Sequence, residues 1–78
     1  MEQKVRRDRG MGDNLRRLRN ERDLSQEKLC AALQLEGCDI GRTTYAKYES
    51  GELNIRASVL IALHDLYACS YDEFFKDL

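Results

Sequence analysis

Proline is absent from this 78-residue sequence, and only five glycines interrupt it. Charged residues, by contrast, make up 35% of the chain. A chain of this length forms one domain, close to the lower size limit for folding on a core of its own. Few chain breakers and many charged residues together favour compact helices joined by short turns.

Long apolar runs are also missing, and none approaches the roughly 20 residues that a membrane span requires. The sequence has no basic start followed by an apolar stretch, which a secretion signal would show. We therefore expect a cytoplasmic protein that makes no contact with a membrane.

The three cysteines, Cys30, Cys38 and Cys69, are an odd number with no close pair. A disulfide framework or a CxxC metal site needs a different spacing, and the single histidine, His64, lacks a plausible set of co-ligands. The chain also has no glycine-rich phosphate loop and no nucleophile–base pair. We therefore expect no metal, no cofactor, no small-molecule ligand and no enzymatic activity.

Charge is unevenly distributed along the chain, although the net charge is only −1. Residues 1–24 carry eight bases and five acids, a net charge of +3, whereas residues 25–53 and 54–78 each have a net charge of −2. A basic front and an acidic back can orient a protein on a polyanion even when the total is near zero. An ordinary solvated surface fits the same distribution.

Apolar residues recur at helical spacing along most of the chain, and no stretch alternates with the period of two that a strand would show. The fold class predicted is all-α, a compact bundle of five helices. The expected helices run from Gly12 or Asp13 to about Arg22, from Ser25 to Leu35 or Glu36, from about Gly41 to Ser50, from about Ile55 to Tyr67, and over SYDEFF after Ser70.

Capping residues mark several of these boundaries. Ser25 is typical of an N-cap, and Gly37 can take the left-handed conformation that follows a helix. Asp39 and Gly41 compete as N-cap of the third helix. Ser70 is expected to cap the last short helix.

The first ten residues, MEQKVRRDRG, are charged and nearly devoid of core-forming side chains. We expect residues 1–10 to form a flexible basic arm, although its bases can also grip a phosphate backbone. Residues 11–78 then make up the folded domain.

The stretch IGRTTYAKYESGE covers the third predicted helix. Its outward residues are Arg42, Thr43, Thr44 and Lys47. Tyr45 and Tyr48 are expected to dock the helix to the core. The major groove of B-DNA admits one helix whose leading residues meet the base edges, so this stripe fits the second helix of a helix-turn-helix. An ordinary amphipathic surface helix fits the composition equally well.

The order of several segments resembles the Cro and phage-repressor type of helix-turn-helix regulators, often called Xre-like. MGDNLRRLRNERDLSQEKLCAAL resembles their opening, with Met11-Gly12, Leu15, Leu18-Arg19 and Leu24-Ser25-Gln26 at the family's positions. IGRTTYAKYESGE resembles the third helix with its Glu-x-Gly ending, and LIALHDLYACSYDEFF the fourth helix and closing turn. The resemblance covers about residues 11–75.

The resemblance implies a lambda-repressor-like DNA-binding domain and a function in transcription. The protein would be a sequence-specific regulator of double-stranded DNA, a repressor, which inserts its third helix into the major groove. Arg42, Thr43 and Lys47 would read bases, and Thr44 would contact a base or a phosphate.

Further positions carry implied roles outside that stripe. Gln26 would bind a phosphate and brace the third helix, and Ser50 and Asn54 would touch the sugar-phosphate backbone. Arg19 and Glu49 would form a structural pair that ties the first helix to the third.

Two departures from the family pattern concern the entry into the third helix. Between Leu33 and Ile40 the chain has about five residues more than the usual tight turn, so either the second helix is longer or the turn is an enlarged loop. Gly41 stands where a capping Ser or Thr is common.

A single module contacts only a few base pairs, so we expect a homodimer, with Tyr71 and Phe75 near the C-terminus as its interface and Phe74 needed inside the core. A second function fits the acidic back half. The domain can instead be a protein-interaction module, such as an antitoxin or adaptor, that keeps the fold without specific DNA binding.

Overall fold

The computed structural model describes residues 3–78, with side chains described for residues 10–78. Its elements are α1 (Gln3–Asn20), α2 (Gln26–Leu35), α3 (Arg42–Ser50), α4 (Ala57–Tyr67) and a 3₁₀-helix, η1 (Tyr71–Glu73). The predicted all-α class is confirmed, since the described residues contain no strand. The count of five α-helices is wrong. The segment after Ser70 forms only i→i+3 hydrogen bonds, such as Glu73 N–H to the Ser70 carbonyl (3.1 Å), and therefore makes a 3₁₀ turn.

The bounds of α1 differ from the prediction at both ends. The helix begins at Gln3 instead of Gly12 or Asp13, because the charged segment before Gly12 forms helix without any apolar periodicity that would reveal it. It ends at Asn20 instead of Arg22, since Asp23 adopts a left-handed backbone with φ of 54°. The flexibility of residues 1–10 stays a prediction, and Met1 and Glu2 lie outside the described residues.

The ends of α2 confirm the capping signals. The Ser25 hydroxyl accepts a hydrogen bond from Lys28 N–H (3.0 Å), and Gly37 is left-handed with φ of 92°. Helix α4 begins at Ala57, two residues later than predicted, after an extended Arg56 that offers no side-chain cap. At η1, the Ser70 hydroxyl accepts from Asp72 N–H (3.1 Å), as predicted for its cap.

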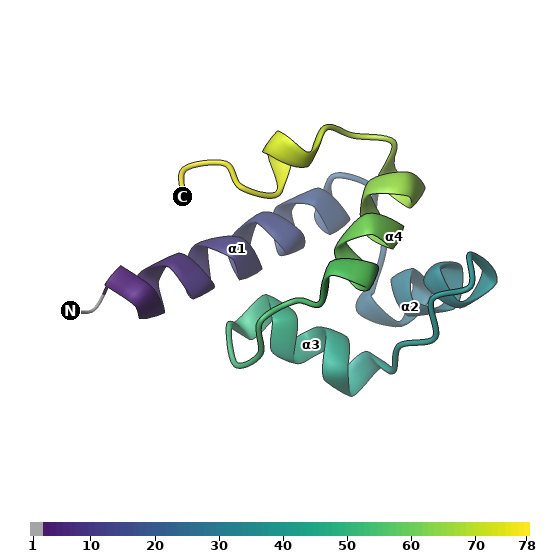
Figure 1. The fold of residues 1–78 in the computed structure, drawn as a ribbon. Helices are drawn as coiled ribbons and strands as arrows, with labels where there is room; N and C mark the ends of the chain where they lie inside the picture. Colours follow the sequence, from purple (N-terminus) through teal and green to yellow (C-terminus); the bar gives the residue numbers. More distant parts are fainter. Residues whose placement is uncertain (1–2) are drawn as a thin grey trace.

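The helices pack around one core. Helix α1 contacts α3, and α2 contacts both α3 and α4. Figure 1 shows α1 crossing the molecule, with α3 on one side and the C-terminal segment returning along the other. The buried apolar side chains come from all four helices, from the α2–α3 connection and from the segment after η1: Leu15, Leu18, Leu29, Cys30, Leu33, Ile40, Tyr45, Tyr48, Val59, Leu63, Tyr67 and Phe74.

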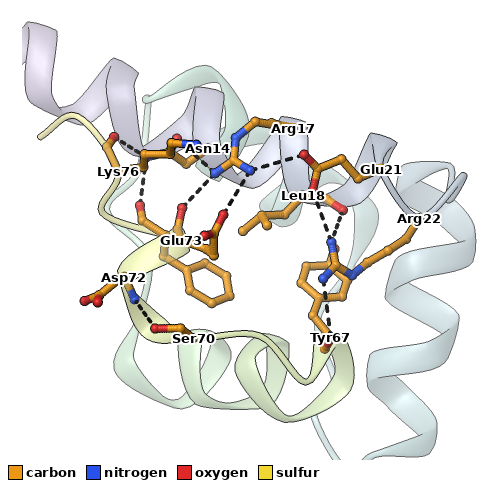
Figure 2. Close-up of polar contacts among 11 residues, drawn as sticks. Asn14, Arg17, Leu18, Glu21, Arg22, Tyr67, Ser70, Asp72, Glu73 and Lys76 are labelled. Atoms are coloured by element: carbon orange, nitrogen blue, oxygen red, sulfur yellow. Dashed lines mark hydrogen bonds and ion pairs between the residues drawn. The ribbon is translucent and has the colours of Figure 1, made fainter.

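The C-terminal segment is held against α1 by polar contacts, which Figure 2 shows in close-up. The Asn14 amide donates hydrogen bonds to the carbonyls of Phe74 (3.0 Å) and Lys76 (2.9 Å). Arg17 pairs with the Glu73 carboxylate (3.2 Å) and donates to the Glu73 carbonyl (2.9 Å). We call Asn14, Arg17 and Glu73 with these carbonyls the C-terminal clasp. Phe74 is fully buried beneath it, as the sequence predicted.

Candidate nucleic-acid interface

Helix α3 presents one polar face to solvent. Its four candidate side chains are all exposed: Arg42, Thr43, Thr44 and Lys47. Because an α-helix turns about 100° per residue, these four positions span an arc of about 200° of the helix circumference, and Tyr45, Tyr48 and Glu49 lie within the remaining arc. The stripe therefore faces outward from the domain.

The opposite face of α3 anchors the helix. Tyr45 is fully buried and Tyr48 is 3% exposed, and their rings meet edge to face with centroids 6.4 Å apart. This confirms the docking role predicted for both residues. Gly51 ends the helix in a left-handed conformation with φ of 84°. The outward stripe is thus fixed by burial of two large rings behind it.

The two bases of the stripe are uncommitted within residues 10–78. Neither the Arg42 guanidinium nor the Lys47 ammonium forms an ion pair or a side-chain hydrogen bond with any described side chain. Such cations keep their donors and charge available for a ligand. A guanidinium can donate two parallel hydrogen bonds to guanine, and threonine can donate, accept or place its methyl on thymine.

Glu49 joins three elements at the inner side of α3. Its carboxylate accepts two hydrogen bonds from Arg19, at 2.7 Å from Nε and 3.0 Å from Nη2, so the pair implied by the resemblance is present. The Gln26 amide donates to the same carboxylate at 3.0 Å. Gln26 thus braces α3 through Glu49, while its phosphate contact stays a prediction.

Burial and hydrogen bonding act in opposite directions on this carboxylate. Glu49 is 2% exposed, and desolvation alone would raise its pKa. The hydrogen bonds that the carboxylate accepts, of which those from Arg19 have the largest effect, act together with the positive charge of Arg19 to outweigh desolvation, and the pKa of Glu49 is lowered. Hydrogen bonding to Glu49 raises the pKa of Arg19 in turn. The pair is therefore charged at neutral pH.

Close backbone contact also fixes α1 on α3. A Cβ atom at Gly12 would overlap the backbone carbonyl of Glu49. Only glycine permits this approach, which brings the α1 backbone onto the end of α3. This close packing explains why glycine stands at position 12, in the Met11-Gly12 pair with which the family resemblance begins.

Ser50 and Asn54 lie beyond the outward stripe. The exposed Ser50 hydroxyl donates to the Lys47 carbonyl (3.1 Å) or the Glu52 carboxylate (3.2 Å), and accepts from Glu52 N–H (3.3 Å). Asn54 is exposed in the α3–α4 connection and borders an open apolar groove. Both side chains are exposed at the surface, and their contacts with the sugar-phosphate backbone of DNA stay predictions.

The residues between Leu33 and Ile40 are divided between α2 and a loop, since Gln34 and Leu35 are still helical. Helix α2 ends at Leu35, and residues 36–41 lead into α3. Cys38 N–H bonds back to the Leu33 carbonyl (2.8 Å), and Ile40 is buried, so the loop is anchored at two points. Gly41 and not Asp39 is the N-cap of α3, and it supplies no side-chain hydrogen bond.

Sequence reasoning missed several residues that position this interface. Asn14 and Arg17 hold the C-terminal segment, and Arg22 lies over the Tyr67 ring with its guanidinium carbon 4.4 Å from the centroid. Arg16 approaches Glu49 as a second arginine. Only the Arg17–Glu21 pair at i,i+4 had a sequence signal, because the other contacts join distant segments.

Neither membrane spans nor metal sites occur in the described part of the chain. None of its helices combines the length and apolar character that crossing a membrane requires. No group of three or more His, Cys, Asp or Glu side chains there is arranged to hold a metal ion. The three cysteines are free thiols.

Comparison with protein families identifies the domain. A helix-turn-helix family model matches residues 15–74, a span that contains residues 15–20 of α1, the whole of α2, α3 and α4, and the outward stripe. Comparisons with curated proteins and with solved structures gave no significant match. The match, the exposed stripe on α3 and the Arg19–Glu49 pair agree with one another. The chain therefore belongs to the Xre-like (Cro and phage-repressor type) helix-turn-helix family of DNA-binding regulators.

Proposed function

We propose that this protein is a sequence-specific regulator that inserts α3 into the major groove of double-stranded DNA. One observation carries the proposal: Arg42, Thr43, Thr44 and Lys47 are exposed together on one face of α3. The two bases have no carboxylate partner among residues 10–78. A rigid helix with a free guanidinium in its first turn suits readout of guanine in the groove.

Each residue takes the role that its chemistry permits. Arg42 donates two hydrogen bonds to a guanine, and Lys47 contacts guanine or a phosphate. Thr43 contacts a base, and Thr44 a base or a phosphate. The neighbouring Gln26, Ser50 and Asn54 contact the sugar-phosphate backbone and set the register of the protein on the duplex.

The sense of regulation and the cellular location belong to the same proposal. We propose that the protein acts as a repressor in the cytoplasm, where a protein bound over a promoter blocks access to that promoter simply by occupying it. Catalysis is not needed for this role, and the family is generally non-enzymatic.

We also propose that two copies bind DNA together as a homodimer. Phe75 is 47% exposed and lines an open groove of about 480 Å³ with Leu53, Ile55, Leu60 and Leu78. Among residues 10–78, no charged side chain lines this groove, although 35% of the chain is charged, so an apolar surface such as a second copy fits it. Tyr71 stands apart, because its ring stacks on His64 with centroids 3.8 Å apart.

A variant series tests that interface. Phe75→Glu should leave a monomer in sedimentation at concentrations where the parent is dimeric, since a carboxylate would be buried in the apolar contact. Tyr71→Glu introduces the same charge outside the groove; the variant should remain dimeric if the groove alone forms the contact, and a monomer would place Tyr71 in the interface as the sequence predicts. A parent chain that is monomeric at all concentrations contradicts the dimer.

Selection of binding sites from random duplex DNA tests base readout directly. The parent should yield a consensus, and its palindromy would reveal a dimer with half-sites about one helical turn apart. Arg42→Ala should relax base preference at one position by about 1–3 kcal/mol. Lys47→Ala should do the same if Lys47 contacts guanine, and should weaken binding to all sequences about equally if it contacts a phosphate. If both variants select the parent's consensus with undiminished preference, the assignment of α3 is wrong.

The protein-interaction module remains the second candidate, and the groove favours it, because the side chains of residues 10–78 that line it are uncharged and a partner helix can also bury them. Salt dependence separates the two functions. Binding to DNA phosphates weakens steeply between about 50 and 200 mM salt. An apolar contact with a partner protein changes little over that range.

A further inference from the structure

Two arginines of α1 converge on the single carboxylate of Glu49. Arg19 is the locked member, with a side chain that is 12% exposed. Its guanidinium donates two hydrogen bonds to Glu49 and a third to the Leu24 carbonyl (2.7 Å). These bonds commit all three of its nitrogens, so Arg19 is tied inward.

Arg16 is the loose member. Its side chain is 52% exposed, and its Nε lies 3.5 Å from Glu49 Oε1 without forming a hydrogen bond among the described residues. Its two Nη groups have no partner there, and Asp13, one turn earlier, forms no ion pair with it. A guanidinium with free donors on the surface can bind an anion.

Arg16 is also not needed to neutralise Glu49. The carboxylate already accepts three hydrogen bonds of 2.7–3.0 Å from Arg19 and Gln26. One carboxylate next to two guanidinium groups leaves one positive charge in surplus. Turning Arg16 outward would leave Glu49 paired, so this movement avoids the cost of an unpaired buried charge.

The position of Gln26 indicates what the surplus charge would meet. Both Gln26 Nε2 (3.0 Å) and Arg16 Nε (3.5 Å) lie close to one atom, Glu49 Oε1. Gln26 is the first residue of α2. A phosphate held by Gln26 would therefore lie within reach of the free end of the Arg16 side chain.

We propose that Arg16 is a phosphate-binding residue that extends the DNA contact from α3 and α2 onto α1. The inference rests on the proposed function, and it concerns backbone contact without base readout. The ligand is a DNA phosphate next to the one that Gln26 contacts. Arg16 leaves its position beside Glu49, and Arg19 continues to balance the charge of the ionised carboxylate.

Salt-dependent binding to a labelled duplex of mixed sequence tests the proposal. In Arg16→Gln, the slope of log affinity against log salt should become shallower by about 0.9, the value for one lost phosphate contact. The ratio of the parent's affinity to that of Arg16→Gln should therefore fall about threefold between about 50 and 200 mM salt. Arg16→Lys should keep the parent's slope, because it retains the charge.

Two further variants control for charge. Lys76→Gln makes the same change of net charge on the C-terminal segment, which lies across α1 from α3 in Figure 1, and should keep the parent's slope. Asp13→Asn removes the acid one turn from Arg16 and should strengthen binding to the mixed-sequence duplex. Thermal unfolding identifies a merely structural role, which would lower the melting temperature of Arg16→Gln and leave the slope unchanged.

The outcomes separate this inference from the proposed function. If the parent binds DNA and Arg16→Gln keeps its slope, the Arg16 contact is overturned and α3 readout stands. A slope change equal to that of Lys76→Gln also overturns it. If the parent binds no duplex at all, the proposed function fails and the Arg16 contact fails with it.

Discussion

The two sides of α1 hold the molecule together by different means. Gly12, Arg16 and Arg19 share the side that meets α3, whereas Asn14, Arg17 and Glu21 share the opposite side, which meets the C-terminal segment. The α3 side has a direct backbone contact and a buried ion pair. The C-terminal side has a neutral amide bonded to two carbonyls and ion pairs that are partly exposed.

The two sides therefore act differently: the α3 side fixes the orientation of α3, whereas the C-terminal side only keeps the C-terminal segment attached. A buried ion pair is tolerated only in one geometry, because displacement of either partner leaves a charge out of water. It therefore fixes α3, whose orientation decides what Arg42 and Lys47 can reach. Exposed ion pairs are individually weak and tolerate movement. The Arg17–Glu73 pair therefore attaches the C-terminal segment without demanding one orientation.

The largest expected effect comes from removing the carboxylate on the α3 side. Glu49→Ala leaves the mostly buried Arg19 guanidinium without its partner, so we expect the free energy of unfolding to fall by about 3–5 kcal/mol in urea titration. The matched change on the C-terminal side, Glu73→Ala, removes a partly exposed partner and should cost about 1 kcal/mol or less. Equal losses in the two variants would refute the contrast between the sides.

The second test uses two glycines of α1. Gly12→Ala places a Cβ on the Glu49 carbonyl, so α1 and α3 must separate, and we expect a loss of about 1–3 kcal/mol in thermal unfolding. Gly10→Ala is the control, because its Cβ would meet only the end of the flexible Leu78 side chain. Alanine favours helix over glycine by about 0.5–1 kcal/mol, which should offset that adjustment. A stable Gly12→Ala would show that the interface is loose.

Asn14→Ala should release the C-terminal segment. The change removes both hydrogen bonds to the carbonyls of Phe74 and Lys76, and we expect a loss of about 1–2 kcal/mol. Amide hydrogen exchange should speed up most in residues 74–78, while α3 keeps its protection. If α3 exchanges faster to the same extent, the two sides of α1 are one cooperative unit.

Acid should weaken the α3 side through Glu49. The pKa of this carboxyl is lowered in the folded state, so its stabilising contribution is complete above the ordinary value of about 4.3 and is lost as pH falls through the folded pKa. Between the two values the unfolded chain binds more protons, and stability therefore falls with falling pH. Unfolding free energies of the parent and Glu49→Gln should converge at low pH. A constant difference between them would contradict this account.

Local signals in the sequence predicted much of the fold. Ser25 and Ser70 act as caps, and Gly37 is left-handed, because these conformations depend on neighbouring residues. The early start of α1 was not predicted, since the residues before Gly12 lack the apolar periodicity that marks a helix. The 3₁₀ form of η1 was not predicted for another reason: Tyr71, Phe74 and Phe75 have helical spacing, and this spacing does not separate a short 3₁₀ turn from an α-helix.

Part of the candidate site was also predicted, because the positions of its residues depend on spacing within a single helix. The spacing of Arg42, Thr43, Thr44 and Lys47 within one helix places them on one face, and the structure leaves that face exposed. The pairing of Arg19 with Glu49 followed from family resemblance. Arg16 carried no comparable signal, because its partner is thirty-three positions away and is reached only through packing.

The sequence by itself determined that the chain is helical and which residues share the face of α3, because helix geometry is set by spacing along the chain. Tertiary structure decided the rest. It buried Glu49 between α1, α2 and α3, gave Arg19 the inward position and left Arg16 at the surface. Arg16 and Arg19 lie three residues apart and have the same side chain, so their chemistry alone does not distinguish them. Only the packing around the Glu49 carboxylate gives Arg19 a structural role and leaves Arg16 exposed.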